Sequence, residues 1–235
     1  FREHPKADSG FECGVLLCNT PGDFLTFEPF CRHMYVGWGI DHDDLSYACS
    51  AISFQNFYRR LFERSKSIKE KSPSIIFDKT PRYITQLPKV QKRLNRPAIA
   101  VIKDPRSLAL SDFKRSKRPL EEIDSWYEEW KKTKMVYMRS AYKGYRYAWK
   151  NKNCHVVRLE DICFNAKTTV KAMFEFVGLE FKSEYLNLRN KRFNNTSGSS
   201  INVGSCMAFM EVLPSRIQER VCSDFSEFDR WFYPF

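Results

Sequence analysis

Two short segments of the chain join a run of β-branched residues to a lysine, a helix-capping residue, a proline and an arginine. Residues 77–83 read Phe-Asp-Lys-Thr-Pro-Arg-Tyr, and residues 102–107 read Ile-Lys-Asp-Pro-Arg-Ser. Thr80 and Asp104 suit the N-cap of a helix, and the proline after each suits the first helical position, where its missing N–H costs nothing. A helix N-terminus with Lys79 or Lys103 beside it is suited to bind an anion such as a phosphate group.

The second segment offers a hydroxyl as well as cations. Ser111 follows Ser107 by four residues, which places both on one face of the expected helix, near Lys103 and Arg106. A hydroxyl and two cations together would complete a phosphate site. The same spacing also fits an ordinary strand-to-helix connection whose basic residues are only solvated. The spacing alone does not decide between these two interpretations.

The elements that would position these residues follow from the apolar pattern. Short apolar runs at 74–77, 98–102 and 155–159 predict buried parallel strands. Helical periodicity predicts helices over 45–64, 120–148 with an interruption near 132–134, 166–177 and 214–225, and a helix-capping turn at 41–44. Strands that alternate with helices predict an α/β fold with a central parallel sheet flanked by helices, whose ligands bind at the carboxyl ends of the strands.

Three stretches resemble, in order, motifs of sulfotransferases that use 3′-phosphoadenosine 5′-phosphosulfate (PAPS). Residues 101–111 resemble the 3′-phosphate-binding motif, a strand followed by Arg-Asp/Asn-Pro and a serine eight residues after the arginine. Residues 77–83 resemble the Glu-Lys-Ser-Pro-x-Tyr segment of carbohydrate sulfotransferases. Residues 157–162 and 174–179 resemble the Tyr-Glu-Asp-Leu strand and the Phe-Leu-Gly-Leu helix end. Lys103 stands where the family usually has arginine, which keeps the charge and loses the bidentate fork.

The resemblance implies a sulfotransferase fold like that of the P-loop nucleoside triphosphate hydrolases, in a single domain over residues 1–235. It also implies transfer of a sulfuryl group from PAPS to a hydroxyl or amine, without a metal. Lys79 and Lys6 would steady the sulfonate and the leaving phosphate, whereas Lys103 and Ser111, with Arg106 beside them, would hold the 3′-phosphate.

The general base is expected in the early part of the chain. Glu28, in a Phe-Glu-Pro-Phe turn, resembles the Gly-Glu-Pro-Phe turn of some bacterial-type members and is the first candidate. Glu12 is the second candidate and His33 the third. A lone carboxylate in a turn is also often a helix cap or half of an ion pair, so a structural role for Glu28 stays open.

The first phosphate loop is the weakest part of the resemblance. The family has a strand followed by Pro-Lys/Arg-Ser-Gly-Thr-Thr, and residues 5–10 carry a proline, Lys6, Ser9 and Gly10 in that order, with two extra residues. One of these is Asp8, which would repel phosphates. Alternatively, the true loop precedes residue 1, because the chain looks cut from a longer one. Residues 191–198, with Arg192, form either a loop that closes over the nucleotide or a surface connector.

Composition narrows the partners and leaves the acceptor open. Lys+Arg 39 against Asp+Glu 28 gives a net charge of +11, which favours an anionic partner such as a nucleotide or an acidic polysaccharide. The longest charge-free run, 193–210, is too polar to span a membrane. The absence of G-x-x-x-x-G-K-[ST] argues against a kinase. Nucleic-acid binding favours aromatic side chains among the basic residues of an exposed face, whereas Trp126, Tyr127 and Trp130 fall mostly on the apolar face of the helix expected over 120–148.

The cysteines and two glycosylation triplets give opposite indications of compartment. Eight scattered cysteines without metal-ligand spacing favour free thiols and the cytoplasm. The Asn-x-Ser/Thr triplets at 194 and 195 fit the Golgi lumen instead. The main alternative to an enzyme is a non-catalytic protein of the same fold that binds a nucleotide or another anion.

Overall fold

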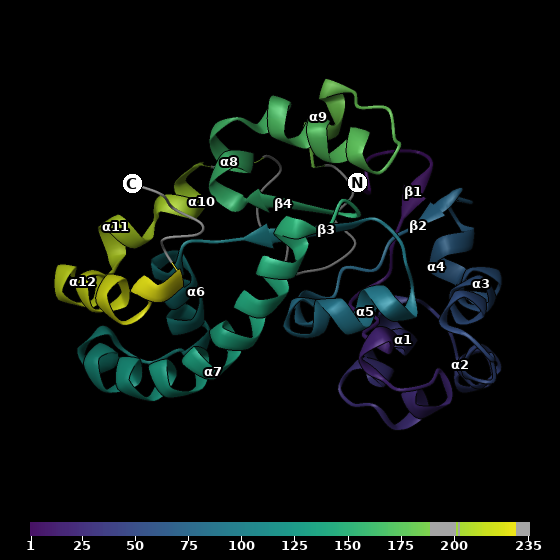
Figure 1. The fold of residues 1–235 in the computed structure, drawn as a ribbon, viewed down its shortest axis with the longest axis horizontal. Helices are drawn as coiled ribbons and strands as arrows, with labels where there is room; N and C mark the ends of the chain where they lie inside the picture. Colours follow the sequence, from purple (N-terminus) through teal and green to yellow (C-terminus); the bar gives the residue numbers. More distant parts are fainter. Residues whose placement is uncertain (189–200, 202, 229–235) are drawn as a thin grey trace. The chain divides into compact units, whose positions relative to one another are not determined.

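The computed structural model describes residues 1–188, 201 and 203–228, and these fall into two compact units (Figure 1). Unit 1 comprises residues 1–96, and unit 2 comprises residues 97–188 with the described residues from 201 to 228. The expectation of a single domain over residues 1–235 stays a prediction.

Unit 1 contains one parallel pair of short strands among many helices. Ala7 pairs with Ile75 and Asp8 with Ile76, so β1 and β2 run in the same direction. Four α-helices and two short 3₁₀ helices lie between them, which gives the long connection that a parallel pair requires. The elements are β1 (Ala7–Asp8), η1 (Val15–Leu17), η2 (Gly22–Thr26), α1 (Phe30–Gly37), α2 (His42–Cys49), α3 (Phe54–Arg64), α4 (Lys66–Lys69), β2 (Ile75–Ile76), η3 (Pro81–Gln86) and α5 (Leu87–Arg93).

The expectation of one helix over 45–64 is wrong, because two capped helices occupy this stretch. The Asp41 carboxylate accepts the N–H of Asp44 at 2.9 Å and begins α2, which confirms the predicted capping turn. Ser53 begins α3 in the same way, because its hydroxyl accepts the N–H of Asn56 at 3.2 Å. A serine side chain that bonds to the backbone locally favours a new start over a continuous helix.

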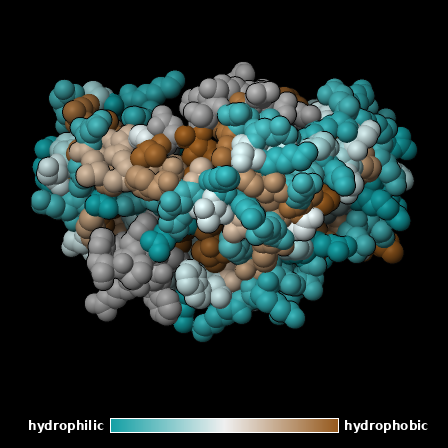
Figure 2. All heavy atoms as spheres, turned by 90° about the horizontal axis from the view of Figure 1, so that it is seen from above, coloured by the Kyte–Doolittle hydropathy of each residue, from teal (hydrophilic) through white to brown (hydrophobic). Residues whose placement is uncertain are grey.

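The core of unit 1 is built on aromatic side chains. Trp38, Phe24 and Phe57 are fully buried, and the rings of Phe24 and Phe57 meet edge to face at 5.7 Å. Hydrophilic side chains dominate the face of the molecule in Figure 2, and hydrophobic ones show in patches between them. Single exposed apolar residues such as Ile52 are normal on a protein surface.

Unit 2 contains the longer pair of strands. β3 and β4 are parallel over five residue pairs, from Ala98 with Cys154 to Ile102 with Arg158, which confirms the predicted strands. The expectation that these strands are buried is wrong in part, because Val101 is 44% exposed and most of the other residues of the pair are only half-buried. Figure 1 shows α9 and α7 on opposite sides of this pair. The elements are β3 (Ala98–Ile102), α6 (Pro105–Ser116), η4 (Leu120–Glu122), α7 (Ile123–Lys150), β4 (Cys154–Arg158), α8 (Leu159–Phe164), α9 (Ala166–Phe176), η5 (Ser183–Leu186), α10 (Val203–Met207), α11 (Phe209–Val212) and α12 (Ser215–Asp224).

The expected interruption near 132–134 is wrong, because α7 is continuous from Ile123 to Lys150. Acidic residues of unit 2 neutralise the lysines in this region. Lys131 pairs with Asp224 at 2.8 Å, and Lys134 pairs with Asp112 at 2.6 Å. The apolar face of α7 packs into the core with α12, which stabilises the helix more than local propensity does. The expected last helix, 214–225, is confirmed as α12.

The α/β class is confirmed. Both strand pairs are parallel, and helices connect the two strands of each pair. The described residues form two separate two-stranded sheets, which is less strand than the central sheet that we expected. In each pair, the two carboxyl ends lie at one edge, and both strand–Lys–cap–Pro segments begin there.

Candidate functional site

Unit 1 brings together two segments that follow its parallel strands. The loop from Ser9 to Gly14 follows β1, and residues 77–83 follow β2. The N–H of Phe77 donates to the carbonyl oxygen of Asp8 at 3.0 Å, which continues the strand pairing to this edge. The two segments therefore leave the sheet side by side.

A ladder of side-chain contacts joins these segments. Each contact links one residue of 12–16 with one of 78–83, so two stretches more than sixty residues apart are held in register. The contacts are Lys79 Nζ to Glu12 Oε1 at 2.9 Å, Cys13 N–H to Asp78 Oδ1 at 3.2 Å, Gly14 N–H to Thr80 Oγ1 at 3.1 Å and Leu16 N–H to the Tyr83 hydroxyl at 3.3 Å.

Asp78 is the centre of this ladder. Its carboxylate accepts the hydroxyls of Tyr58 at 2.6 Å, Tyr83 at 2.5 Å and Thr80 at 2.7 Å. Burial, and then the charge of Asp78, raise the pKa of both tyrosines well above the ordinary value. Both phenols therefore stay protonated and remain donors throughout the physiological pH range.

Glu12, rather than Glu28, lies beside Lys79. The Glu12 carboxylate bonds to the exposed Lys79 ammonium, and the Nδ1 of His33 lies 3.4 Å from the Glu12 carbonyl oxygen. Glu28 lies at the start of α1, exposed, and faces Arg32 across one helical turn at 3.8 Å. The second candidate for the base thus contacts Lys79 and the third lies beside the second, whereas the first candidate, before α1, faces Arg32 at the surface.

Lys6 lies at the opposite end of β1 from the loop. It precedes the strand, is exposed, and its carbonyl oxygen accepts the N–H of Ile75 at 2.9 Å. The structure thus places Lys6 before the strand, whereas the lysine of the family's loop follows it. A role for Lys6 at the sulfonate stays a prediction.

Ser9 and Gly10 follow β1 and are buried. The N–H of Ser9 donates to the carboxylate of Asp8 at 2.7 Å, and its hydroxyl donates to the Gly10 carbonyl oxygen at 2.7 Å. A Cβ added at Gly10 would lie 2.2 Å from the Trp38 ring. Asp8 is itself buried and faces Arg2 at 3.6 Å. Internal packing and hydrogen bonds therefore account for these residues, and their contact with a nucleotide stays a prediction.

Sequence reasoning missed Arg2 and Asp78. Arg2 donates to the carbonyl oxygen of Ser9 at 2.7 Å and so fixes the start of the loop. Asp78 stands inside the first motif, directly before Lys79, so a carboxylate at that position was a signal for a partner. Its partners, Tyr58 and Cys13, come from distant parts of the chain, which no local pattern indicates.

In unit 2, Lys103 follows β3 and Asp104 caps α6. The Asp104 carboxylate accepts the N–H of Arg106 at 2.7 Å, which confirms the predicted N-cap. The same carboxylate holds the Arg106 guanidinium at 2.7 Å, and this guanidinium lies 4.5 Å from the centre of the Phe209 ring. Arg106 is thus used at the helix start, and its contact with a nucleotide stays a prediction.

Charges of both signs lie near Lys103. Burial, and then the positive charge of Arg115, lower the pKa of Lys103, whereas the carboxylates of Glu160 and Asp112 raise it. The Glu160 carboxylate also accepts the N–H of Asp104 at 3.1 Å, next to Lys103 in the chain, so the contact of Lys103 and Ser111 with a phosphate stays a prediction. Ser111 is half-buried one turn after the buried Ser107. Four positions spaced four residues apart hold a lysine, two serines and an arginine: Lys103, Ser107, Ser111 and Arg115. A bound anion would relieve the repulsion between these cations.

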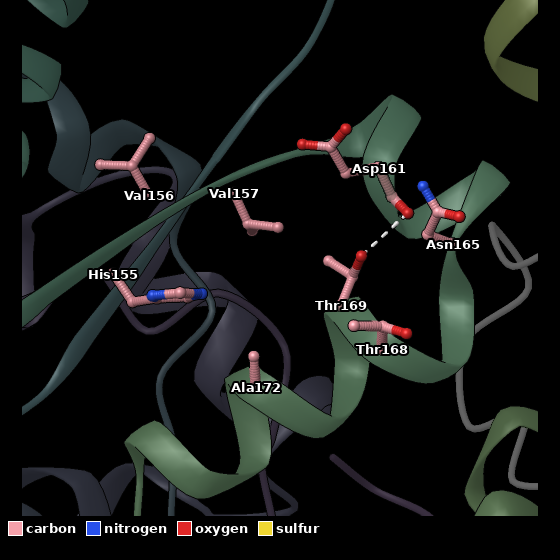
Figure 3. Close-up of a pocket in the computed structure, with 8 residues that line it drawn as sticks. All are labelled: His155, Val156, Val157, Asp161, Asn165, Thr168, Thr169 and Ala172. Atoms are coloured by element: carbon pink, nitrogen blue, oxygen red, sulfur yellow. Dashed lines mark hydrogen bonds between the residues drawn. The ribbon is translucent and has the colours of Figure 1, made fainter.

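A hollow of about 460 Å³ lies between β4 and α8–α9 in unit 2, as Figure 3 shows. His155 and Val157 point into it from one face of β4, and Val156 points to the other side. The Thr169 hydroxyl donates to the Asp161 carbonyl oxygen at 3.0 Å on its wall. Among the residues that the structure describes, none of the site residues expected from the sequence lines this hollow.

Three further observations concern metals, membranes and the C-terminal loop. Within the described ranges 1–188, 201 and 203–228, no group of three His, Cys, Asp or Glu could hold a metal ion. No helix in the same part of the chain is long and apolar enough to cross a membrane. Arg192 and the expected loop over 191–198 lie outside the described residues.

The comparison with protein families matches residues 27–208 to the sulfotransferase domain. The chain belongs to the sulfotransferase domain family. The match includes both strand–Lys–cap–Pro segments of this sulfotransferase-family chain and begins after the Ser9–Gly14 loop. No curated protein matches the chain.

Solved sulfotransferase domains share the fold. The sulfotransferase domain of the Synechococcus PCC 7002 olefin synthase aligns with a TM-score of 0.57 and 12% identity, over 95% of this chain and 86% of that domain. The sulfotransferase domain from the curacin biosynthetic pathway aligns with a TM-score of 0.55 and 14% identity, over 96% of this chain and 90% of that domain. These similarities confirm the expected sulfotransferase fold.

Proposed function

We propose that this chain transfers a sulfuryl group from PAPS to a hydroxyl or amine of an acceptor. The observation that carries the proposal is that both strand–Lys–cap–Pro segments place their lysine at the carboxyl end of a strand in a parallel pair. That edge is where α/β proteins bind ligands. Membership of the sulfotransferase family supports this reaction over other uses of an anion site.

In this proposal, Lys79 and Glu12 serve the sulfuryl end, and Lys103 and Ser111 serve the 3′-phosphate. Sulfuryl transfer needs cations on the non-bridging and leaving oxygens and a base for the acceptor proton. Lys79 supplies a cation, and Glu12 takes the proton as the acceptor oxygen or nitrogen bonds to sulfur and the bond from sulfur to the leaving phosphate breaks. Lys103 and Ser111 hold the 3′-phosphate.

The net charge of +11 supports an acidic acceptor, and an acidic polysaccharide is the first class to test. We place the reaction in the cytoplasm, because eight free cysteines, four of them buried in unit 1, fit a reducing compartment better than the Golgi lumen.

The nucleotide half of the proposal is tested by calorimetric titration with 3′-phosphoadenosine 5′-phosphate. We expect micromolar binding to the parent chain and its loss in Lys103→Ala and in Ser111→Ala. Lys132→Ala, an exposed lysine on α7, is the matched control and should bind as the parent does. A folded parent that does not bind would refute PAPS use.

The transfer half is tested with radiolabelled PAPS and a panel of acceptors. Loss of a general base typically costs about 10²–10⁴ in rate, so we expect this loss in Glu12→Gln. Glu28→Gln should retain the rate of the parent. If Glu28→Gln lost the rate and Glu12→Gln retained it, Glu28 would be the general base instead of Glu12.

A non-catalytic anion-binding protein is the second candidate, and one observation favours it. Loop N–H groups that a phosphate would need are used internally: that of Ser9 by Asp8, and those of Cys13 and Gly14 by the 78–83 segment. Nucleotide binding without transfer to any acceptor would support this candidate.

A further inference from the structure

The Asp78 carboxylate binds donors from four different places in unit 1. They are the Tyr58 hydroxyl from α3, the Tyr83 hydroxyl from η3, the neighbouring Thr80 hydroxyl and the N–H of Cys13 in the loop. A carboxylate offers about four lone-pair sites, and these donors use them. Asp78 is therefore a structural acceptor, although it precedes Lys79 directly.

We propose that Asp78 is a positioning residue that fixes the loop at Cys13 and thereby holds Glu12 against Lys79. The proposal rests on the proposed function, in which Glu12 and Lys79 act on the sulfuryl group. The contact from Asp78 to Cys13 lies one residue from Glu12 on one segment and one residue from Lys79 on the other. Fixing Cys13 thus fixes the side-chain pair beside it.

The chemistry of the contacts requires a carboxylate at position 78. Two donors bond to each of its oxygens, and hydrogen bonds to an ionised acceptor are the strong ones. Asparagine has the same shape but carries no charge and presents an NH₂ group in place of one acceptor oxygen, so the donors at that oxygen lose their acceptor. A buried donor that loses its acceptor in this way is costly, so the segment would be released.

The direct test is hydrogen exchange of single amides in the chain without ligand. In Asp78→Asn we expect the Cys13 amide and its neighbour Gly14 to exchange about 10- to 100-fold faster than in the parent, the factor that loss of a buried acceptor implies. Asp124→Asn removes a half-buried carboxylate of unit 2 that pairs with Arg216 and Arg220, and it serves as the matched control, with unchanged exchange at these amides. Unchanged exchange in Asp78→Asn would overturn the proposal.

If Asp78→Asn does not fold, a second variant tests whether Asp78 fixes the loop at Cys13. Tyr58→Phe removes one of the donors that hold the Asp78 carboxylate toward the Cys13 N–H, so in this proposal the contact at Cys13 is weakened and we expect a few-fold faster exchange there. Exchange identical to that of the parent in this folded variant would then overturn the proposal.

Kinetics separate positioning from general loss of structure. Because Asp78 acts through Glu12, the double variant Asp78→Asn/Glu12→Gln should be no slower than Glu12→Gln alone, with rates normalised to the nucleotide-binding fraction. Additive losses would contradict the proposal. A parent without PAPS binding would refute the proposed function, whereas the exchange experiment would still decide whether Asp78 holds the loop.

Discussion

Substitution of Gly10 by alanine gives a sharp test of why a glycine stands in the loop after β1. The added Cβ would lie 2.2–2.4 Å from three carbons of the Trp38 indole, where carbon atoms normally keep about 3.5–4.0 Å. Trp38 is fully buried, and its Nε1–H donates to the Phe11 carbonyl oxygen at 2.7 Å. The ring therefore has little freedom to move away.

The expected loss of stability follows from these contacts. Overpacking of a core costs about 1–3 kcal/mol, and loss of the indole hydrogen bond adds about 0.5–1.5 kcal/mol. We therefore expect Gly10→Ala to lower the free energy of unfolding by about 1.5–4.5 kcal/mol, measured by urea unfolding followed by circular dichroism. Each kcal/mol corresponds to about 2–4 °C in Tm for a chain of this size.

Gly22→Ala is the matched control. The nearest atoms to its Cβ are the Thr20 hydroxyl at 3.7 Å and the Cys49 carbonyl oxygen at 4.0 Å, which are ordinary contacts. We expect this variant to be as stable as the parent or more stable by up to about 1 kcal/mol. If Gly10→Ala were as stable as Gly22→Ala and lost only nucleotide affinity, packing against Trp38 would not be the reason for the glycine.

Three further predictions address charge, hydrogen bonding and thiol reactivity. The pKa of Lys103 is lowered, so this side chain loses its charge at a lower pH than an exposed lysine does. Nucleotide affinity measured by calorimetry should therefore fall as the pH rises through that pKa. Lys103→Arg should remove this fall, because arginine stays charged. Tyr127→Phe removes the hydroxyl bond to Asp224 at 2.9 Å and should cost about 0.5–1.5 kcal/mol in urea unfolding, whereas no loss would show that Lys131 alone satisfies Asp224. Burial raises the pKa of Cys49 to about 12, so in an alkylation time course at pH 8 it should react only after unfolding, unlike the exposed Cys222, and equal rates would contradict this.

Local signals in the sequence predicted the parts of the fold that depend on neighbours in the chain. Asp41, within the turn expected at 41–44, and Asp104 are caps as expected, because a cap is decided within three residues. Thr80 was also expected as a cap, but its hydroxyl makes no cap bond and donates to Asp78 instead. The runs at 98–102 and 155–159 were expected as strands because a short apolar run is also a local signal. Local signals failed at Ser53, because the apolar pattern continues through the residues that separate α2 from α3.

The candidate site could be predicted only in pieces. The motif around Lys79 was visible in the sequence, but its partner Glu12 stands in another segment, and periodicity carries no information on such contacts. Gly10 shows the same limit: a glycine in a loop is equally suited to a nearby phosphate and to a nearby indole, and only the fold distinguishes these.

The ladder between 12–16 and 78–83 also has a consequence during synthesis. Its contacts span 65 to 67 residues. A ribosome adds about 5–20 residues per second, so Glu12 is made about 3–13 s before Lys79. Throughout that interval the N–H groups of 13, 14 and 16 have no ladder partners, and this edge of unit 1 cannot close. A chain that stalls before residue 78 should therefore leave residues 1–20 open to proteases, whereas a chain whose residues 78–83 have emerged from the ribosome can protect them.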